Sequence, residues 1–174
     1  MSLADEPIRL GLPDAGEMLT LQRAAFVTEA QLHDDPALPP LTQTLAELRD
    51  ELSCPSVFAY GYRVGGRLVA ATRLEVNGSA AELRRTSVAP DQQGRGLGTR
   101  LLTRVEHLIP ELVTAIELFT GERSSANLRL YSRLGYVETH RTPVGSYFLV
   151  HMRKVLRANA LGGTRPGDDR TISL

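Results

Sequence analysis

The residues from Val57 to Val88 alternate between apolar and polar side chains with a period of two, which is the pattern of β-strands. Two short breaks, Gly65-Gly66 and Asn77-Gly78, divide this region, and both pairs are typical of the two-residue turns that join antiparallel strands. Ala89-Pro90 ends the third segment. The pattern therefore predicts three antiparallel strands joined as a meander.

Helical and strand patterns flank this meander on both sides. In chain order we expect a strand at 7–10, helices at 14–29 and 45–52, the meander, a helix at 97–108, a strand at 115–119, a helix at 124–134 and strands at 136–140 and 147–154. Prolines predict a loop over 31–40. The nearly continuous apolar run at 115–119 follows a helix, which is typical of a parallel strand buried on both faces.

The order β-α-α-β-β-β-α-β-α-β-β indicates a single α/β domain (mixed α+β) over residues 1–156. We expect its central sheet to be mixed and largely antiparallel, with six to seven strands, and to be flanked by about four helices. Residues 157–174 have no apolar period and are predicted to be a disordered tail.

Composition limits the partners of the chain. Its 20 basic and 20 acidic residues balance, so no overall field attracts nucleic acid or a membrane surface. The arginines around 84–104 raise nucleic-acid binding as an alternative, but no aromatic cluster provides a stacking platform beside them. No apolar run reaches the roughly 20 residues of a membrane helix, and the N-terminus lacks the pattern of a secretory signal. With Cys54 as the only cysteine, we expect a cytoplasmic protein in a reducing compartment.

Three glycines, Gly94, Gly96 and Gly98, stand at alternate positions after the meander, around the start of the helix that begins at Leu97. The first backbone N–H groups of a helix have no intrahelical partner, and the helix dipole adds partial positive charge there. Glycine removes the side chains that would hold an anion away from those donors. The spacing therefore predicts a phosphate site, with Arg95 and Arg100 close by.

Known phosphate-binding patterns differ in how well they match this run. A P-loop needs lysine followed by serine or threonine after its second glycine, and the chain has no such pair there. A Rossmann fingerprint needs a third glycine where Thr99 or Leu101 stands, and it follows a parallel strand rather than a meander. That fingerprint remains a weak alternative, as does a glycine-rich turn that binds no ligand.

A third pattern matches. Gln93-Gly94-Arg95-Gly96-Leu97-Gly98 fits Q/R-x-x-G-x-G/A, the acyl-CoA signature of the GCN5-related N-acetyltransferase (GNAT) superfamily. The downstream segment NLRLYSRLGYVET, with Asn127 and Tyr131, is similar to that family too. The resemblance extends from about Ile8 to Lys154. It implies a GNAT-like fold with acetyl-CoA as co-substrate, no metal, and an amine acceptor attacked directly in a ternary complex.

The resemblance also implies roles for individual residues. The pyrophosphate of CoA would bind the N–H groups of residues 94–99, and the pantetheine arm would pair with residues 86–88 in a slot between that strand and the strand at 115–119. The amide of Val88 would stabilise the oxyanion of the reacting thioester. The implied cofactor-binding residues are Thr86, Ser87, Val88, Gln93, Gly94, Arg95, Gly96, Leu97, Gly98, Thr99 and Asn127.

For the chemistry, the resemblance implies that Tyr131 is the general acid that protonates the leaving thiolate; otherwise it is a core tyrosine of an amphipathic helix. Glu82 is the first candidate for the base that deprotonates the amine, because it is expected to share one side of its strand with Arg84 and Thr86. Its alternative is a surface carboxylate paired with Arg84. The weaker candidates are His33, His140 and His151, and the resemblance also allows for no dedicated base.

The sequence says least about the identity of the amine acceptor. The resemblance puts it against residues 26–41 and 140–148, where His33-Asp34-Asp35 favours a cationic amine. Two further expectations stay open: a homodimer through the final strands, and a catalytically silent acyl-CoA-binding sensor or regulatory domain in place of an enzyme.

Overall fold

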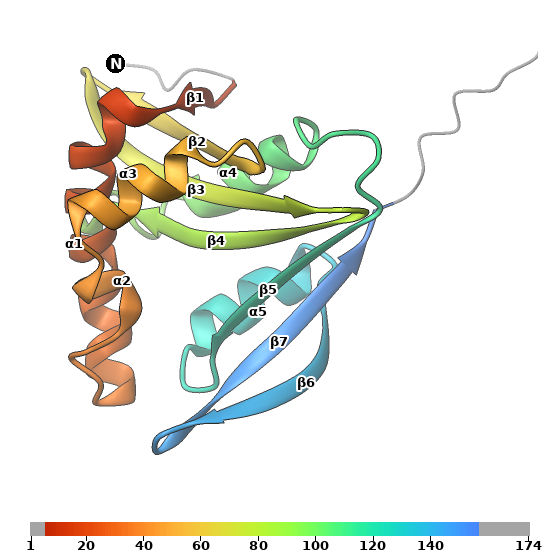
Figure 1. The fold of residues 1–174 in the computed structure, drawn as a ribbon. Coiled ribbons are helices and arrows are strands. Elements are labelled where there is room, and N and C mark those ends of the chain that lie inside the picture. Colours follow the sequence, from red (N-terminus) through yellow and green to blue (C-terminus); the bar gives the residue numbers. More distant parts are fainter. Residues whose placement is uncertain (1–5, 157–174) are drawn as a thin grey trace, which may run out of the picture.

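The computed structural model describes residues 6–156, which form a seven-stranded sheet with helices on both faces (Figure 1). The elements are β1 (Ile8–Leu10), α1 (Ala15–His33), α2 (Pro39–Thr42), α3 (Leu45–Ser53), β2 (Val57–Val64), β3 (Arg67–Asn77), β4 (Ala80–Val88), α4 (Leu97–Glu106), β5 (Ala115–Gly121), α5 (Ser125–Arg133), β6 (Val137–Val144) and β7 (Tyr147–Val155). The predicted α/β fold is confirmed, and the predicted elements follow one another in the expected order, with the short helix α2 in addition. The predicted tail, 157–174, lies outside the described residues.

The predicted meander is present as β2-β3-β4, paired antiparallel throughout. Both of its turns use left-handed glycines, with φ of 59° and 82° at Gly65 and Gly66 and 61° at Gly78. The sheet has the order β1-β2-β3-β4-β5-β7-β6, and β4 and β5 form its parallel pair.

The region after α1 differs from the prediction of a loop over 31–40. The helix α1 continues to His33 and ends at Asp34, which adopts the left-handed conformation with φ of 51°. The short helix α2 begins at Pro39, and prolines occupy its first positions. Proline has no N–H to lose at the first turn of a helix, and its fixed φ favours the helical conformation there. The prolines therefore start a helix rather than only breaking one.

The parallel pairing of β4 with β5 is short. It joins Ala80, Ala81 and Glu82 to Ala115, Ile116 and Glu117, and beyond this point the two strands diverge (Figure 1). The strand β5 pairs on its other side with β7 over its whole length, so β5, β7 and β6 swing away from β4 together. The predicted opening of the sheet between these strands is thus confirmed.

A β-bulge interrupts β4 just where this opening begins. Arg84 pairs with Arg73 and Ser87 with Ala71, so β4 has one extra residue, and Arg85 has a φ of 55°. Thr86 Oγ1 lies 2.9 Å from Oγ1 of Thr72, the residue next to Arg73 on β3. The expectation that Glu82, Arg84 and Thr86 share one side is therefore wrong, because the extra residue reverses the alternation.

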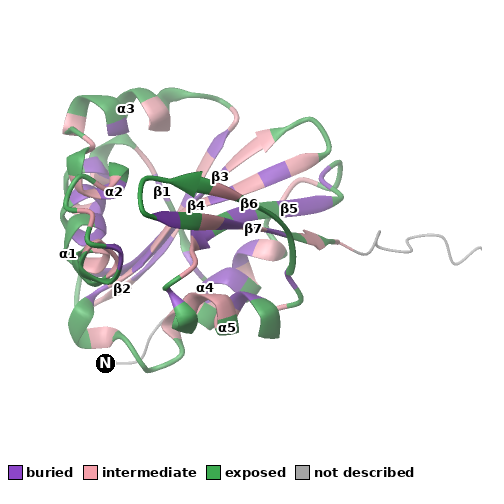
Figure 2. Cartoon of the chain, turned by 90° about the horizontal axis from the view of Figure 1, so that it is seen from below, coloured by how far each residue is buried: buried purple, intermediate pink, exposed green. Residues whose placement is uncertain are grey.

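The core lies between the sheet and the helices that cover it. Figure 2 shows the buried stretches along the central strands and on the inner sides of the helices, with exposed residues on the outside. The largest of the fully buried apolar side chains come from both layers: Leu48, Tyr62, Val69, Leu74, Leu101, Leu102, Val105, Ile116 and Val150. Three of them, Leu101, Leu102 and Val105, come from α4.

One arginine is buried in this core and ties three helices to β3. Arg73 is 2% exposed, and its Nε lies 3.0 Å from Glu51 Oε1 on α3, an ion pair without good hydrogen-bond alignment. Its Nη2 donates to Gln22 of α1 at 2.7 Å, and Gln22 in turn donates to the carbonyl of Pro40 in α2 at 2.8 Å. Burial lowers the pKa of Arg73 to about 10, and the charge of Glu51 opposes that shift.

We expect Glu51→Gln to destabilise the fold, because it leaves the buried Arg73 charge without its counter-ion. Losing one partner of a buried pair costs about 3 kcal/mol or more, which for a domain of this size lowers the unfolding midpoint by roughly 6–12 °C. Thermal unfolding at pH 7 measures the change. Glu138→Gln is the matched control, since Glu138 pairs with Arg141 on the exposed surface, and it should leave the midpoint nearly unchanged. Equal unfolding midpoints for the two variants would contradict the role of Glu51 as the stabilising counter-ion of Arg73.

Candidate functional site

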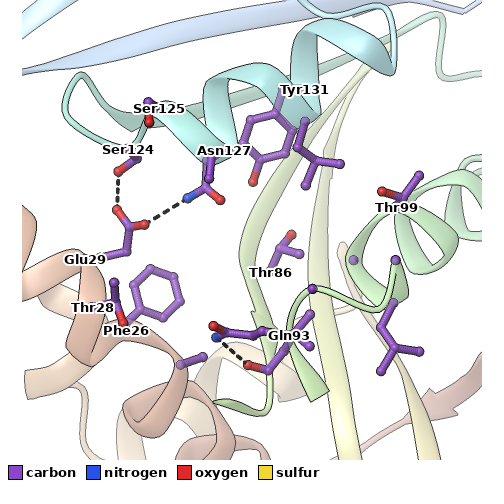
Figure 3. A pocket seen from close by; sticks show the side chains of 18 of the residues that line it. Phe26, Thr28, Glu29, Thr86, Gln93, Thr99, Ser124, Ser125, Asn127 and Tyr131 are labelled. Carbon is purple, nitrogen blue, oxygen red and sulfur yellow. Dashed lines mark hydrogen bonds between the residues drawn. The ribbon is translucent and has the colours of Figure 1, made fainter. Parts of the chain in front are cut away.

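Two cavities meet where the sheet opens. The larger, of about 530 Å³, lies between β4, the glycine loop (residues 93–96), α5 and α1, and the smaller, of about 300 Å³, lies between α1, α2 and the β5-β7-β6 side. Some side chains line both cavities, at their junction. Figure 3 shows them from close by, among the other side chains that line the larger cavity. These shared residues are Phe26, Glu29, Thr86, Asn127 and Tyr131.

The glycine loop forms one end of the larger cavity. Gly94 and Gly96 have φ of 73° and 76°, the left-handed conformation that side chains disfavour, and no atom lies within 4 Å of where a Cβ would be built on either. Gly96 is the N-cap of α4, and no side chain caps this helix. The amides of Leu97, Gly98 and Thr99 in its first turn therefore lack an intrahelical acceptor and line a cavity that an anion can enter.

The open edge of β4 forms a second wall. Thr86 and Val88 line the larger cavity, and Gln93 donates from Nε2 to the carbonyl of Val88 at 3.1 Å. Ser87 alternates away from the cavity; it is 2% exposed, and its hydroxyl donates to the carbonyl of Arg85 at 3.0 Å. An extended ligand could pair with β4 here as a further strand does, because β5 has already diverged.

Tyr131 of α5 reaches into the junction of the two cavities. Figure 3 shows its hydroxyl pointing towards Thr86 on β4. Burial raises the pKa of the Tyr131 hydroxyl to about 12; its hydrogen bond with Thr86 acts in the opposite direction, and the charge of Glu29 adds to the increase. The hydroxyl is therefore protonated at neutral pH and can donate a proton to an anion formed at the junction.

Glu29 of α1 is a junction residue that the sequence interpretation did not single out. Its carboxylate accepts hydrogen bonds from Ser124 Oγ and, at 3.0 Å, from Asn127 Nδ2 (Figure 3). The side chain is 21% exposed, and each of its oxygens can accept a further hydrogen bond. The helical spacing of Phe26, Glu29 and His33 puts all three on one side of α1, which was a signal in the sequence.

Comparison with known families decides the class of the chain. The model of the acetyltransferase (GNAT) family matches residues 18–136, which include the glycine loop, Asn127 and Tyr131. The chain belongs to the GNAT family of acetyltransferases. A search among curated protein sequences finds no match.

Solved GNAT structures share the fold at low identity. The chain is similar to the crystal structure of the PaiA N-acetyltransferase from Thermoplasma acidophilum in complex with coenzyme A, with 18% identity over 89% of this chain and 99% of that one, and a TM-score of 0.72. It is also similar to the ribosomal-protein-S18-alanine N-acetyltransferase from Escherichia coli, with 20% identity over 96% and 100% and a TM-score of 0.71.

The GNAT motif residues predicted from the sequence are largely brought together. All of the predicted cofactor-binding residues line the larger cavity except two, Ser87 and Arg95. Arg95 is exposed and donates to Gln92 at 3.3 Å.

Within residues 6–156 no helix is long and apolar enough to cross a membrane, and no group of three or more His, Cys, Asp or Glu side chains could hold a metal ion.

Most of the candidate bases predicted from the sequence do not line the cavities, in contrast to the residues of the GNAT motif. Glu82 lines neither cavity, and its carboxylate accepts from Arg84 Nη2 at 2.9 Å. His140 and His151 stack on each other, with ring centroids 4.1 Å apart, and line neither cavity. His33 lines the smaller cavity; it is 2% exposed, and its Nδ1 lies 2.9 Å from the carbonyl of Glu29.

Proposed function

We propose that this GNAT protein transfers the acetyl group of acetyl-CoA to a primary amine of a small molecule or peptide. The observation that carries the proposal is the junction of two cavities at Tyr131, one of which ends at the glycine loop and at the free amides in the first turn of α4. A reaction between two bound molecules in a ternary complex needs such an arrangement, with a proton donor between them.

Acetyl-CoA would occupy the larger cavity. Its pyrophosphate would accept hydrogen bonds from the amides of residues 94–99, and its pantetheine arm would pair with residues 86–88 of β4. The complex of the Thermoplasma acidophilum relative with coenzyme A supports this choice of co-substrate. No metal is needed for these contacts, since backbone amides and the dipole of α4 supply the positive potential.

In the reaction, the amine nitrogen attacks the thioester carbonyl, and the amide of Val88 would donate to the developing oxyanion. A C–N bond forms as the C–S bond breaks; the nitrogen loses a proton, and the departing sulfur gains one from Tyr131. The phenolate then recovers its proton from the amine side or from water. As the base, Glu82 acting through a water stays a prediction, and Glu29 is the carboxylate that lines both cavities.

A catalytically silent acyl-CoA sensor is the alternative, because it would use the same larger cavity. Thermal-shift and free-thiol assays with acetyl-CoA and a panel of amines distinguish the two. Release of CoA thiol in proportion to an added amine supports the enzyme, whereas stabilisation by acetyl-CoA with no thiol release for any amine supports the sensor. Cys54 is a free and exposed thiol that would add to the signal of a thiol assay, so the assay should use Cys54→Ser protein. Size-exclusion chromatography of that protein tests the proposed homodimer.

We expect Gly96→Ala to weaken the binding of CoA by roughly tenfold. An alanine in the left-handed conformation costs about 1–2 kcal/mol, so the loop would rearrange and its amides would lose their alignment. Gly98→Ala is the matched control, because Gly98 has an ordinary φ and an added Cβ meets Val88 Cγ2 only at 3.7 Å. Calorimetric titration with CoA measures both variants. Unchanged affinity in Gly96→Ala would contradict the role given to the loop.

Tyr131→Phe should lower kcat by about a hundredfold or more, the usual contribution of a general acid, and leave CoA affinity unchanged. Tyr136→Phe is the control, since Tyr136 is buried nearby but lines neither cavity. Steady-state rates with an active amine and calorimetry with CoA test both variants. Full activity in Tyr131→Phe would remove the assigned acid.

The raised pKa of Tyr131 also predicts the pH dependence. With a pKa of about 12, the acid stays protonated, so its ionisation should not lower kcat below pH 10. The unfolded chain releases the tyrosine proton near pH 10. The contribution of Tyr131 to the free energy of unfolding is therefore constant below pH 10 and decreases between pH 10 and 12. Chemical denaturation across this range should show a smaller decrease in Tyr131→Phe than in the unchanged protein.

A further inference from the structure

The smaller cavity combines an apolar wall with a few charged groups. Its volume of about 300 Å³ is at the low end for ligand pockets, so it suits a compact molecule. The apolar wall consists of Phe26, Leu38, Pro39, Phe119, Val144 and Leu149. The identity of the charged groups therefore decides which compact ligand fits.

Arg85 is the cation of this cavity, and none of the hydrogen bonds and ion pairs among residues 6–156 involves its guanidinium. The carboxylates whose charge reaches it are paired with other arginines: Glu51 with Arg73, and Glu82 with Arg84. Burial lowers the pKa of Arg85, so the group is partly removed from water without a protein partner. A guanidinium in that setting matches a carboxylate, which it can bind through two parallel hydrogen bonds.

Two acidic residues, Asp35 and Glu29, line the smaller cavity, and they differ in their position and in their hydrogen-bond partners. Asp35 accepts a hydrogen bond from the Tyr147 hydroxyl at 3.1 Å, which fixes β7 to the end of α1. Glu29 lies at the junction with the larger cavity, next to Tyr131, where an attacking nitrogen must be. Its oxygens hold Ser124 and Asn127 and can each accept one more hydrogen bond. Glu29 is therefore the group that an incoming ammonium would meet.

From this arrangement we infer that the acceptor is a small amino acid with an apolar side chain, whose carboxylate pairs with Arg85 and whose ammonium group pairs with Glu29. The inference rests on the proposed acetyl transfer and names its substrate class. A polyamine would leave Arg85 facing a second cation. The amino terminus of a peptide would bring an amide rather than a carboxylate to Arg85.

The first experiment measures binding without turnover. Calorimetry on the CoA-saturated protein compares N-acetyl-leucine with N-isopentylacetamide, which lacks only the carboxylate. We expect N-acetyl-leucine to bind roughly ten- to hundredfold more tightly, the contribution of hydrogen bonds between charged groups. Arg85→Gln should remove this preference, and Arg84→Gln, whose guanidinium is held by Glu75 and Glu82, should keep it. Equal binding of the two ligands by the unchanged protein, or a preference that survives in Arg85→Gln, would overturn the inference.

The variant itself needs a safeguard, because Arg85 has a φ of 55°. Arg85→Asn serves as a second variant if Arg85→Gln does not fold, since asparagine adopts this conformation more readily than other side chains. Thermal unfolding of both variants with saturating CoA confirms that the larger cavity is intact.

The second experiment measures turnover with leucine, leucinamide and isopentylamine. We expect kcat/KM to be highest for leucine by roughly ten- to hundredfold, with the difference carried by KM, and to decrease in Glu29→Gln. Equal kcat/KM for leucine and isopentylamine overturns the amino-acid acceptor and leaves acetyl transfer standing. Absence of thiol release with every amine overturns the acetyl transfer, whereas the binding experiment still decides whether Arg85 holds a carboxylate.

Discussion

The early end of the pairing between β4 and β5 is the constraint on which the site depends. After Glu82 and Glu117 the two strands separate, and the backbone edge of β4 is left facing a cavity instead of a neighbour. An unpaired strand edge in a protein interior needs other hydrogen-bonding partners, because buried N–H and C=O groups are costly to leave unpaired. A bound extended molecule can provide them. Both cavities, the glycine loop and Tyr131 surround this single opening.

The bulge in β4 decides what faces the opening. One extra residue reverses the alternation between Arg84 and Thr86, which brings Thr86 to the junction beside Tyr131 and leaves Glu82 outside it. The same residue, Arg85, takes a backbone conformation that side chains disfavour and lines the smaller cavity. Backbone strain of this kind persists only where the surroundings over-determine it, and it is concentrated at functional sites.

What could be predicted from the sequence was local. The meander, the glycine loop and the i, i+4 relation of Asn127 and Tyr131 depend on spacings within a few residues, and the structure contains all three. The alternation of side chains along β4 does not reveal the extra residue of the bulge. The prediction that Thr86 lies on the same face of the strand as Glu82 and Arg84 was therefore wrong. Glu29 meets Ser124 and Asn127 across 95 and 98 residues, and no local pattern contains such a contact. Its partners are set by how α1 crosses the open sheet.

This crossing gives Glu29 two physical roles that are coupled. The helix α1 packs on β3 and β4, whereas α5 follows β5 on the other side of the opening. Two sets of contacts connect the two sides of the opening where β4 and β5 no longer pair. Glu29 accepts hydrogen bonds from Ser124 and Asn127. His33 accepts a hydrogen bond from the amide of Arg123 at 3.3 Å. Removing the Glu29 carboxylate would therefore loosen the walls of the cavity as well as abolish a charge. Glutamine retains an acceptor for one of these hydrogen bonds, so it separates the charge from the structural contact more cleanly than alanine.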